Sequence, residues 1–154
     1  MTKRITKAQK SRQNSFGFLI QLVARRIEVR MKASLAEIDL DIKGFSNLMI
    51  LREGDGIKQR ELGRLLDFPE YATSRCVDVL EKDGLVERRP DPNSRRAHLI
   101  YLTDAGRKKS DLLPGIIMKN NKLVLEDLTE EEIEQVISTL HKVAKIPDGG
   151  DPNL

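Results

Sequence analysis

The segment Gly84–Gly106, GLVERRPDPNSRRAHLIYLTDAG, constrains the fold more than any other part of the chain. Its two runs LVERR and AHLIYLT are rich in β-branched and apolar residues, and the turn-forming sequence PDPN separates them. This pattern predicts a β-hairpin. The hairpin carries one arginine pair before the turn, Arg88 and Arg89, and a second pair after it, Arg95 and Arg96. So much positive charge around a tight turn requires either acidic partners in the chain or an anionic partner outside it.

Two short helices are predicted directly before the hairpin. The segment 58–68, KQRELGRLLDF, has leucines at helical spacing. The next helix has Pro69 at its start and Gly84 after its end, which are the preferred positions of these residues. Two helices across a tight turn, followed by a hairpin, form a helix-turn-helix with a wing.

The second of these helices separates into an inner and an outer face. The face predicted to be buried contains Thr73, Cys76, Val77 and Leu80, and the outer face contains Tyr71, Ser74, Arg75 and Asp78. A DNA major groove admits one helix, and side chains reach base edges only from its exposed face. A basic wing can enter the narrow minor groove, where the negative potential is enhanced. The predicted DNA-binding residues are therefore Lys58, Gln59, Arg60, Tyr71, Ser74, Arg75, Arg95 and Arg96.

A structural explanation exists for each of these features. An amphipathic helix with a solvated outer face is common, and the wing arginines could pair with Glu87 and Asp91. Exposed ion pairs of that kind contribute only about 0 to 1 kcal/mol, so they do not exclude a DNA contact.

Apolar stripes occur at both ends of the chain. Residues from Phe16 to Ile38 repeat at helical spacing, and Thr129 with Glu132 forms a capping box before a closing amphipathic helix. Asp41 and Thr103 are predicted caps of two further helices, and Pro114 predicts a bend. A lobe of about 50 residues has too small a core to bury both terminal stripes, so a homodimer is expected.

Composition excludes several classes of protein. No segment approaches the roughly 18 apolar residues of a membrane span, and no secretory signal precedes the first helix, so a cytoplasmic protein without a membrane partner is expected. One cysteine and two histidines favour neither a disulfide nor a zinc site, and no cofactor is expected. Charge is segregated: residues 1–32 hold nine Lys or Arg and one acid, whereas residues 126–134 hold six acids and no base. This distribution fits either solvated surfaces or a basic face turned toward nucleic acid.

The segment Val77–Gly106 resembles the signature of the MarR-type transcriptional regulators, with its Gly-Leu-Val step, its arginine wing and its Leu-Thr-x-x-Gly end. Helix order extends the resemblance over nearly the whole chain. One position departs from the family pattern, because Ser94 stands where the wing has its second acid. The usual carboxylate brace of the wing arginines is therefore missing, and we expect a tip that orders itself only on DNA.

The resemblance implies a single domain, 1–154, that is mainly α-helical with a β-hairpin wing. Dimerisation helices are expected at 13–39 and 104–146, and a winged helix-turn-helix lobe at 41–103 with its wing at 85–103. It also implies a homodimer that binds double-stranded DNA at a pseudo-palindromic operator, most often as a repressor. A small, often aromatic effector would bind between the dimerisation helices and the lobe and release the DNA; the residues that bind it are not identified.

Three other functions fit the sequence less well. A winged helix can serve as a protein-interaction module, but Arg75, Arg95 and Arg96 argue against that alternative. An enzyme is not indicated, because the chain has no GxSxG, zinc-ligand spacing or glycine-rich phosphate loop. A redox role for Cys76 is disfavoured because the residue is predicted on the inner face, where it would serve as a small apolar filler.

Overall fold

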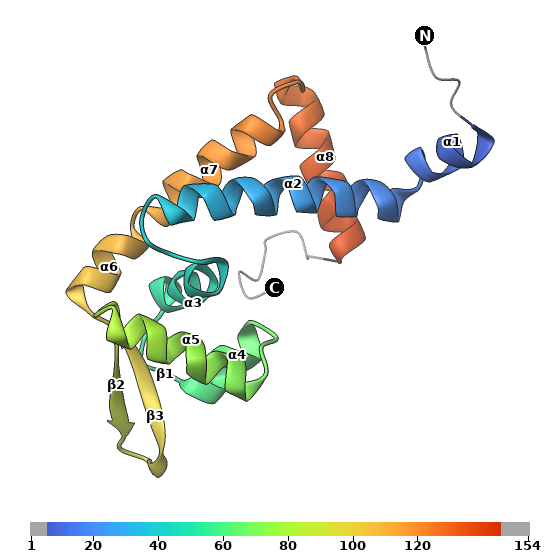
Figure 1. The fold of residues 1–154 in the computed structure, drawn as a ribbon. Coiled ribbons are helices and arrows are strands. Elements are labelled where there is room, and N and C mark those ends of the chain that lie inside the picture. Colours follow the sequence, from blue (N-terminus) through green and yellow to red (C-terminus); the bar gives the residue numbers. More distant parts are fainter. Residues whose placement is uncertain (1–5, 146–154) are drawn as a thin grey trace.

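The structure is a computed structural model that describes residues 6–145, except for the side chains of Ala8 and Arg95. Helices dominate, and three short strands form one antiparallel sheet, which confirms the predicted fold class (Figure 1). No helix within 6–145 is long and apolar enough to span a membrane. The helices are α1 (Lys7–Gln13), α2 (Phe16–Ala36), α3 (Ile42–Glu53), α4 (Gln59–Leu65), α5 (Glu70–Lys82), α6 (Asp104–Ser110), α7 (Leu113–Val124) and α8 (Glu130–Ala144). The strands are β1 (Ile57–Lys58), β2 (Val86–Asp91) and β3 (Ser94–Leu102).

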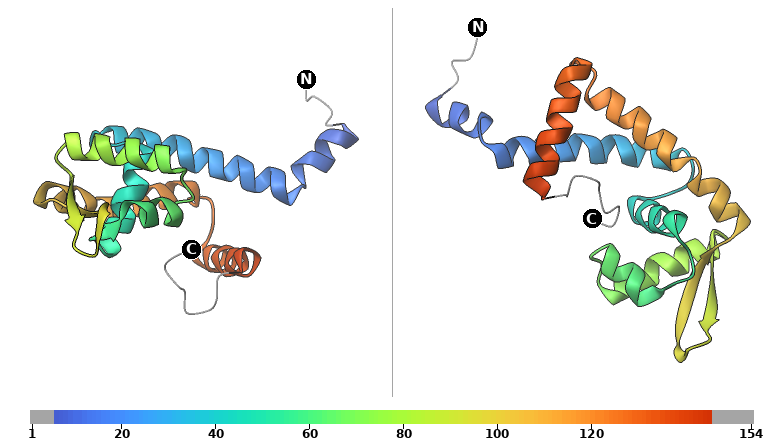
Figure 2. Two further views of the ribbon diagram at one scale, coloured as in Figure 1. Left: turned by 90° about the horizontal axis from the view of Figure 1, so that it is seen from below. Right: turned by 180° about the vertical axis from the view of Figure 1, so that it is seen from behind.

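Two groups of elements make up the molecule. Helices α3 to α5 and the sheet form the lobe, whereas α2 and α7 pack along each other beside it (Figure 1). Helix α1 continues beyond the far end of α2, and α8 leaves the end of α7 and stands away from the lobe (Figure 2). None of the 15 residues of α8 is buried, although the helix is strongly amphipathic in sequence.

Helix ends follow the predicted local signals. The Asp41 carboxylate accepts from the backbone N–H of Gly44 at 2.6 Å, and the Thr103 hydroxyl accepts from Gly106 at 3.0 Å. Thr129 and Glu132 form the predicted capping box. Pro114 lies in the first turn of α7, so the expected bend is a break between α6 and α7.

The lobe has one hydrophobic core. The predicted inner face of α5 is buried, with Val77 and Leu80 at its centre, so that prediction is confirmed. The other fully buried large side chains of this core include Leu35, Leu48, Leu51, Leu62 and Ile100. Because Leu35 belongs to α2, the end of that helix contributes to the lobe's core.

The sheet has the strand order β1-β3-β2. Hairpin β2–β3 was predicted, but β1 was expected to be part of a connector. This two-residue strand pairs Ile57 with Ile100 and Lys58 with Leu99. It therefore attaches the start of α4 to the wing.

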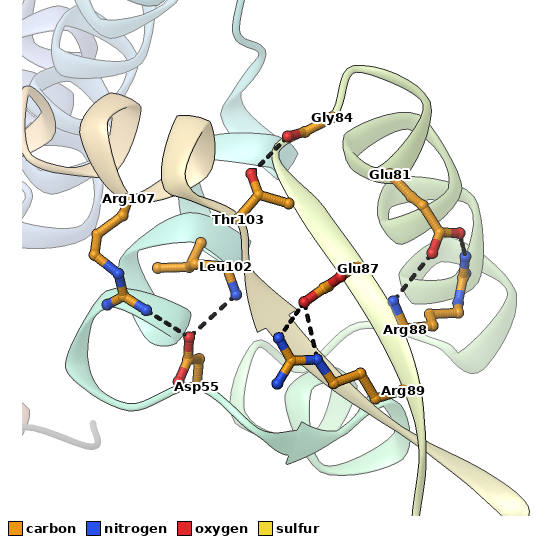
Figure 3. Close-up of polar contacts among 9 residues, drawn as sticks. All are labelled: Asp55, Glu81, Gly84, Glu87, Arg88, Arg89, Leu102, Thr103 and Arg107. Atoms are coloured by element: carbon orange, nitrogen blue, oxygen red, sulfur yellow. Dashed lines mark hydrogen bonds and ion pairs between the residues drawn. The ribbon is translucent and has the colours of Figure 1, made fainter.

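Polar contacts fix the base of the wing (Figure 3), and one glycine lets α6 pack against it. The Thr103 hydroxyl donates to the Gly84 carbonyl at 2.6 Å, and the Asp55 carboxylate accepts from Leu102 N–H at 3.1 Å and from Arg107 at 2.9 Å. A Cβ on Gly106 would lie 1.8 Å from the Leu85 carbonyl oxygen. Only glycine therefore lets α6 approach β2 this closely.

We expect Gly106→Ala to lower the free energy of unfolding by about 3 kcal/mol, because a backbone carbonyl rather than a flexible side chain obstructs the added methyl group. The matched control is Gly115→Ala in α7, where an added Cβ has no neighbour within 4 Å. Removing that helical glycine should be neutral or stabilising by up to about 1 kcal/mol. Urea unfolding followed by circular dichroism measures both, and equal stability of the two variants would contradict the proposed close contact.

Candidate nucleic-acid interface

Helix α5 exposes the predicted recognition residues in its first turns. Tyr71 is 72% exposed, Arg75 is exposed and Ser74 is half-buried. The helix lies beside β2, and the hairpin extends past the helices of the lobe (Figure 1). A helix and a basic hairpin side by side match the shape of adjacent DNA grooves.

The three predicted phosphate ligands at the start of α4, Lys58, Gln59 and Arg60, have side chains in different environments. Lys58 Nζ lies 3.2 Å from Asp91 Oδ2, and the side-chain oxygen of Gln59 accepts from Arg88 Nε at 3.1 Å. Arg60 is exposed. Of the three predicted phosphate ligands, Lys58 and Gln59 thus have partners within the chain.

The wing tip has a carboxylate brace despite Ser94. The side chain of Asp91 is 2% exposed, its Oδ1 accepts from Asn93 N–H at 2.8 Å, and its Oδ2 faces Lys58. The Asn93 hydrogen bond and, after it, Lys58 hold the pKa of the Asp91 carboxyl below its ordinary value against the opposing effect of burial. Asp91 therefore ties the turn to β1 through Lys58, so the tip has a carboxylate contact before DNA binds. The expected loss of a carboxylate brace on the wing arginines themselves stays a prediction.

The four wing arginines occupy different environments. Arg89 pairs with Glu87 (Figure 3). Its guanidinium carbon also lies 4.3 Å from the centroid of the Tyr101 ring. Arg88 is largely buried beneath α5. Arg96 is exposed on β3, whereas the side chain of Arg95 lies outside those that the structure describes. Sequence reasoning paired Asp91 with an arginine and missed its contact with Lys58, because β1 was not foreseen.

A pocket of about 460 Å³ lies behind the recognition helix. One wall is the end of the α2–α3 connection with the start of α3, and the other is α5. Its apolar lining includes Leu40, Ala72, Cys76, Val79 and Leu80, and its charged residues include Lys43, Arg75 and three aspartates. Tyr71 and Arg75 border both this pocket and the outer face of α5.

Cys76 is a buried thiol at the pocket wall. It is 7% exposed, and the Asn47 side-chain amide donates to its sulfur at 3.2 Å. Burial, helped by the nearby Asp41 carboxylate, raises the pKa of the thiol to about 11. The thiol is consequently protonated at neutral pH, as expected for a small apolar filler rather than an oxidant sensor.

Comparison with known proteins tests the resemblance to the MarR-type regulators. Residues 47–97 match the model of the MarR family. An HTH-type transcriptional regulator of Bacillus subtilis, YybA, is 25% identical over 82% of this chain and 84% of its own. Wild-type MarR of Escherichia coli in its apo form superimposes with a TM-score of 0.76 at 27% identity, covering 84% of this chain and 96% of that one. A MarR variant from the same organism, complexed with operator DNA, gives a TM-score of 0.74 at 27% identity, covering 82% and 91%.

The family-model match and the solved MarR structures confirm the resemblance of Val77–Gly106 to the MarR-type transcriptional regulators. Members of that family are transcription regulators rather than enzymes. The MarR signature also has a physical explanation here. Its Leu-Thr-x-x-Gly end is the sequence in which Thr103 caps α6 and Gly106 packs against Leu85.

The contacts of Asp91 make the stability of the protein depend on pH in a defined direction. A lowered pKa means that the carboxylate stabilises the folded state above the ordinary aspartate pKa of about 3.9, and that this contribution is lost as the pH falls through the lower folded value. Asp91→Asn should therefore lower the thermal midpoint by a few degrees near neutral pH. The difference from wild type should shrink below about pH 4. Replacement of the exposed Glu37 by Gln is the control, and an Asp91→Asn effect that is constant with pH would contradict the brace.

Proposed function

We propose that this MarR-family chain binds a pseudo-palindromic operator in double-stranded DNA as a homodimer and represses transcription until a small aromatic effector releases it. The observation that carries the proposal is the exposed Arg75 on a helix that lies beside a braced wing bearing the exposed Arg96. The likeness to a MarR variant crystallised with operator DNA supports the same reading.

Each DNA-facing residue has a proposed role. Arg75 donates to a guanine edge in the major groove, since arginine makes its commonest specific contact there. Tyr71 and Ser74 bond bases or phosphates from the same helix, and Arg60 binds the backbone at the start of α4. Arg96, with Arg95, enters the minor groove. The side chains of Lys58 and Gln59 contact Asp91 and Arg88. We therefore assign any phosphate contact of these two residues to their backbone N–H groups at the start of α4.

The homodimer is supported by apolar surface at both ends of the chain. Half or more of the side-chain surface is exposed at Phe16 of α2, at Met118 of α7 and at Val143 of α8. Leu19, Ile20, Val23, Val136 and Ile137 add to the same exposed set. Single exposed apolar residues are ordinary, but a set concentrated on terminal helices marks an interface. We therefore propose 13–39 and 104–146 as the dimerisation segments, of which residue 146 lies outside the described range.

A protein-interaction module remains the alternative. It would need a recognition face and wing without net positive charge, whereas Arg60, Arg75 and Arg96 are all exposed on this side of the lobe. The charge therefore favours DNA.

Titration of the protein with its own upstream DNA tests the proposal. Light scattering should show two chains bound to each operator. Arg75→Ala should weaken operator binding by about 1 to 3 kcal/mol. Arg96→Ala should reduce the slope of log affinity against log salt by about 0.9, the value for one lost phosphate contact. Lys10→Ala on α1 removes an exposed cation outside the lobe and the proposed dimerisation segments and serves as the control. Equal affinity for operator and shuffled DNA, with dimerisation intact, would refute the proposed function.

The pocket behind α5 is the proposed effector site. Its volume of about 460 Å³ lies within the usual range for small ligands, and its apolar lining is accompanied by Lys43, Arg75 and three aspartates. An aromatic ring that carries one polar group, as in phenol or benzoate, fits that chemistry. Since Tyr71 and Arg75 border the pocket and also face outward, a ligand there would disturb the DNA-facing side chains.

Filling this pocket should separate effector binding from DNA binding. Benzoate and phenol are the probes, and at least one should raise the thermal midpoint, weaken operator binding and increase expression from a promoter fusion. Val79→Trp should abolish these responses, because Val79 is 57% exposed at the pocket and indole would occupy it. Responses that persist unchanged in Val79→Trp would place the effector elsewhere.

A further inference from the structure

Among the wing side chains that the structure describes, Arg88 is the most extensively bonded. Its guanidinium donates to Asp78 Oδ1 at 2.6 Å, to Glu81 Oε2 at 2.5 Å and to Gln59 Oε1 at 3.1 Å. The side chain is only 18% exposed. Its own backbone N–H donates to Glu81 Oε1 at 3.0 Å, so Glu81 holds both the main chain and the side chain of the residue (Figure 3).

These partners come from two different elements of the helix-turn-helix. Asp78 and Glu81 lie three residues apart on one face of α5, and the carbonyl of Ser74, one turn earlier, lies 3.5 Å from the guanidinium. Gln59 is the first residue of α4. Because the guanidinium is planar and its donors diverge in a fixed fork, it can satisfy these acceptors together in only one arrangement.

That arrangement has two consequences for the recognition helix. First, contacts to Asp78 and Glu81 from one point of β2 fix how far α5 is rotated about its own axis. The rotation decides where Tyr71 and Arg75 point, since they lie one to three turns earlier on the same helix. Second, the cation offsets two carboxylates that would otherwise stand unpaired on a helix proposed to approach phosphates.

We propose that Arg88 is a positioning residue for DNA recognition: it locks α5, the start of α4 and the wing into one rigid reading unit without contacting DNA itself. This inference rests on the proposed function. It assigns the two arginine pairs of the hairpin different tasks, with Arg88 organising the lobe from within and Arg96 facing outward. Specificity should depend on Arg88 more than overall affinity does, since a misrotated helix still presents its positive charge to phosphates.

A charge-balanced double variant, Arg88→Met with Glu81→Gln, tests the proposal. It removes one cation and one anion, keeps the aliphatic stem and leaves the net charge unchanged. Arg88→Lys is the second variant, since it keeps the charge but lacks the fork. Arg52→Met is the matched control, because Arg52 pairs with Asp111, at 3.5 Å, rather than with α4 or α5. For each protein, operator and shuffled duplexes are titrated over a range of salt, well below the thermal midpoint.

In the double variant, the ratio of operator affinity to shuffled-DNA affinity should fall by at least about tenfold, which corresponds to the loss of one specific base contact. Arg88→Lys should lose an intermediate part of it. The salt slope should stay within about 0.5 of wild type in both, because no phosphate contact is removed. Arg52→Met should keep the wild-type ratio.

Two results would overturn the proposal. A salt slope lower by about 0.9 in the double variant would make Arg88 a phosphate ligand. An unchanged affinity ratio in folded variants of lower thermal midpoint would leave it a purely stabilising residue. If the wild-type protein itself did not distinguish operator from shuffled DNA, the proposed function would be refuted and this inference with it. Failure of the inference alone leaves the wild-type discrimination intact, so the two outcomes are distinguishable.

Discussion

Strand β2 holds together the elements proposed to face DNA, because it is fixed along its whole length. At its start, the Leu85 carbonyl meets Gly106 of α6 at a distance that tolerates no side chain. In its middle, Arg88 ties it to α5 and to the start of α4. At its end, Asp91 pairs with Lys58 and closes the turn through Asn93. The recognition helix and wing consequently have one relative placement, which DNA reading by two grooves at once requires.

The charge of the hairpin is divided between inward and outward tasks. Arg88 and Arg89 have carboxylate partners in the lobe, and Lys58 is paired with the buried Asp91. Arg75 and Arg96 remain exposed on the face proposed to meet DNA. The positive charge around the tight turn therefore has two explanations. Part of it pairs with carboxylates of the chain, and only the exposed part is available to DNA phosphates.

Sequence reasoning succeeded where structure follows from neighbouring residues. Caps such as Asp41 and Thr129, the hairpin and the buried face of α5 depend on local spacing and were predicted correctly. It failed where distant segments meet. Strand β1 has only two residues, so no periodicity marks it, and its pairing with β3 exists only in the folded sheet. Without β1, the contact of Lys58 with Asp91 could not be foreseen.

The candidate site was likewise predictable where it depends on neighbouring residues, and not where it depends on distant ones. Exposure of Tyr71 and Arg75 follows from helical periodicity, whereas the inward turn of Gln59 depends on Arg88, which lies 29 residues away in sequence. The pocket behind α5 likewise requires the connection between α2 and α3 to lie against that helix, and no sequence motif predicts this contact.

Hydroxyl-radical footprinting of the wild-type protein on its own upstream DNA tests the central claim most directly. A homodimer with one rigid reading unit per chain should protect two inverted half-sites whose centres are about one helical turn, roughly 34 Å, apart, with minor-groove protection at the outer flank of each. Protection of a single half-site, or uniform protection without a repeated pattern, would contradict the account.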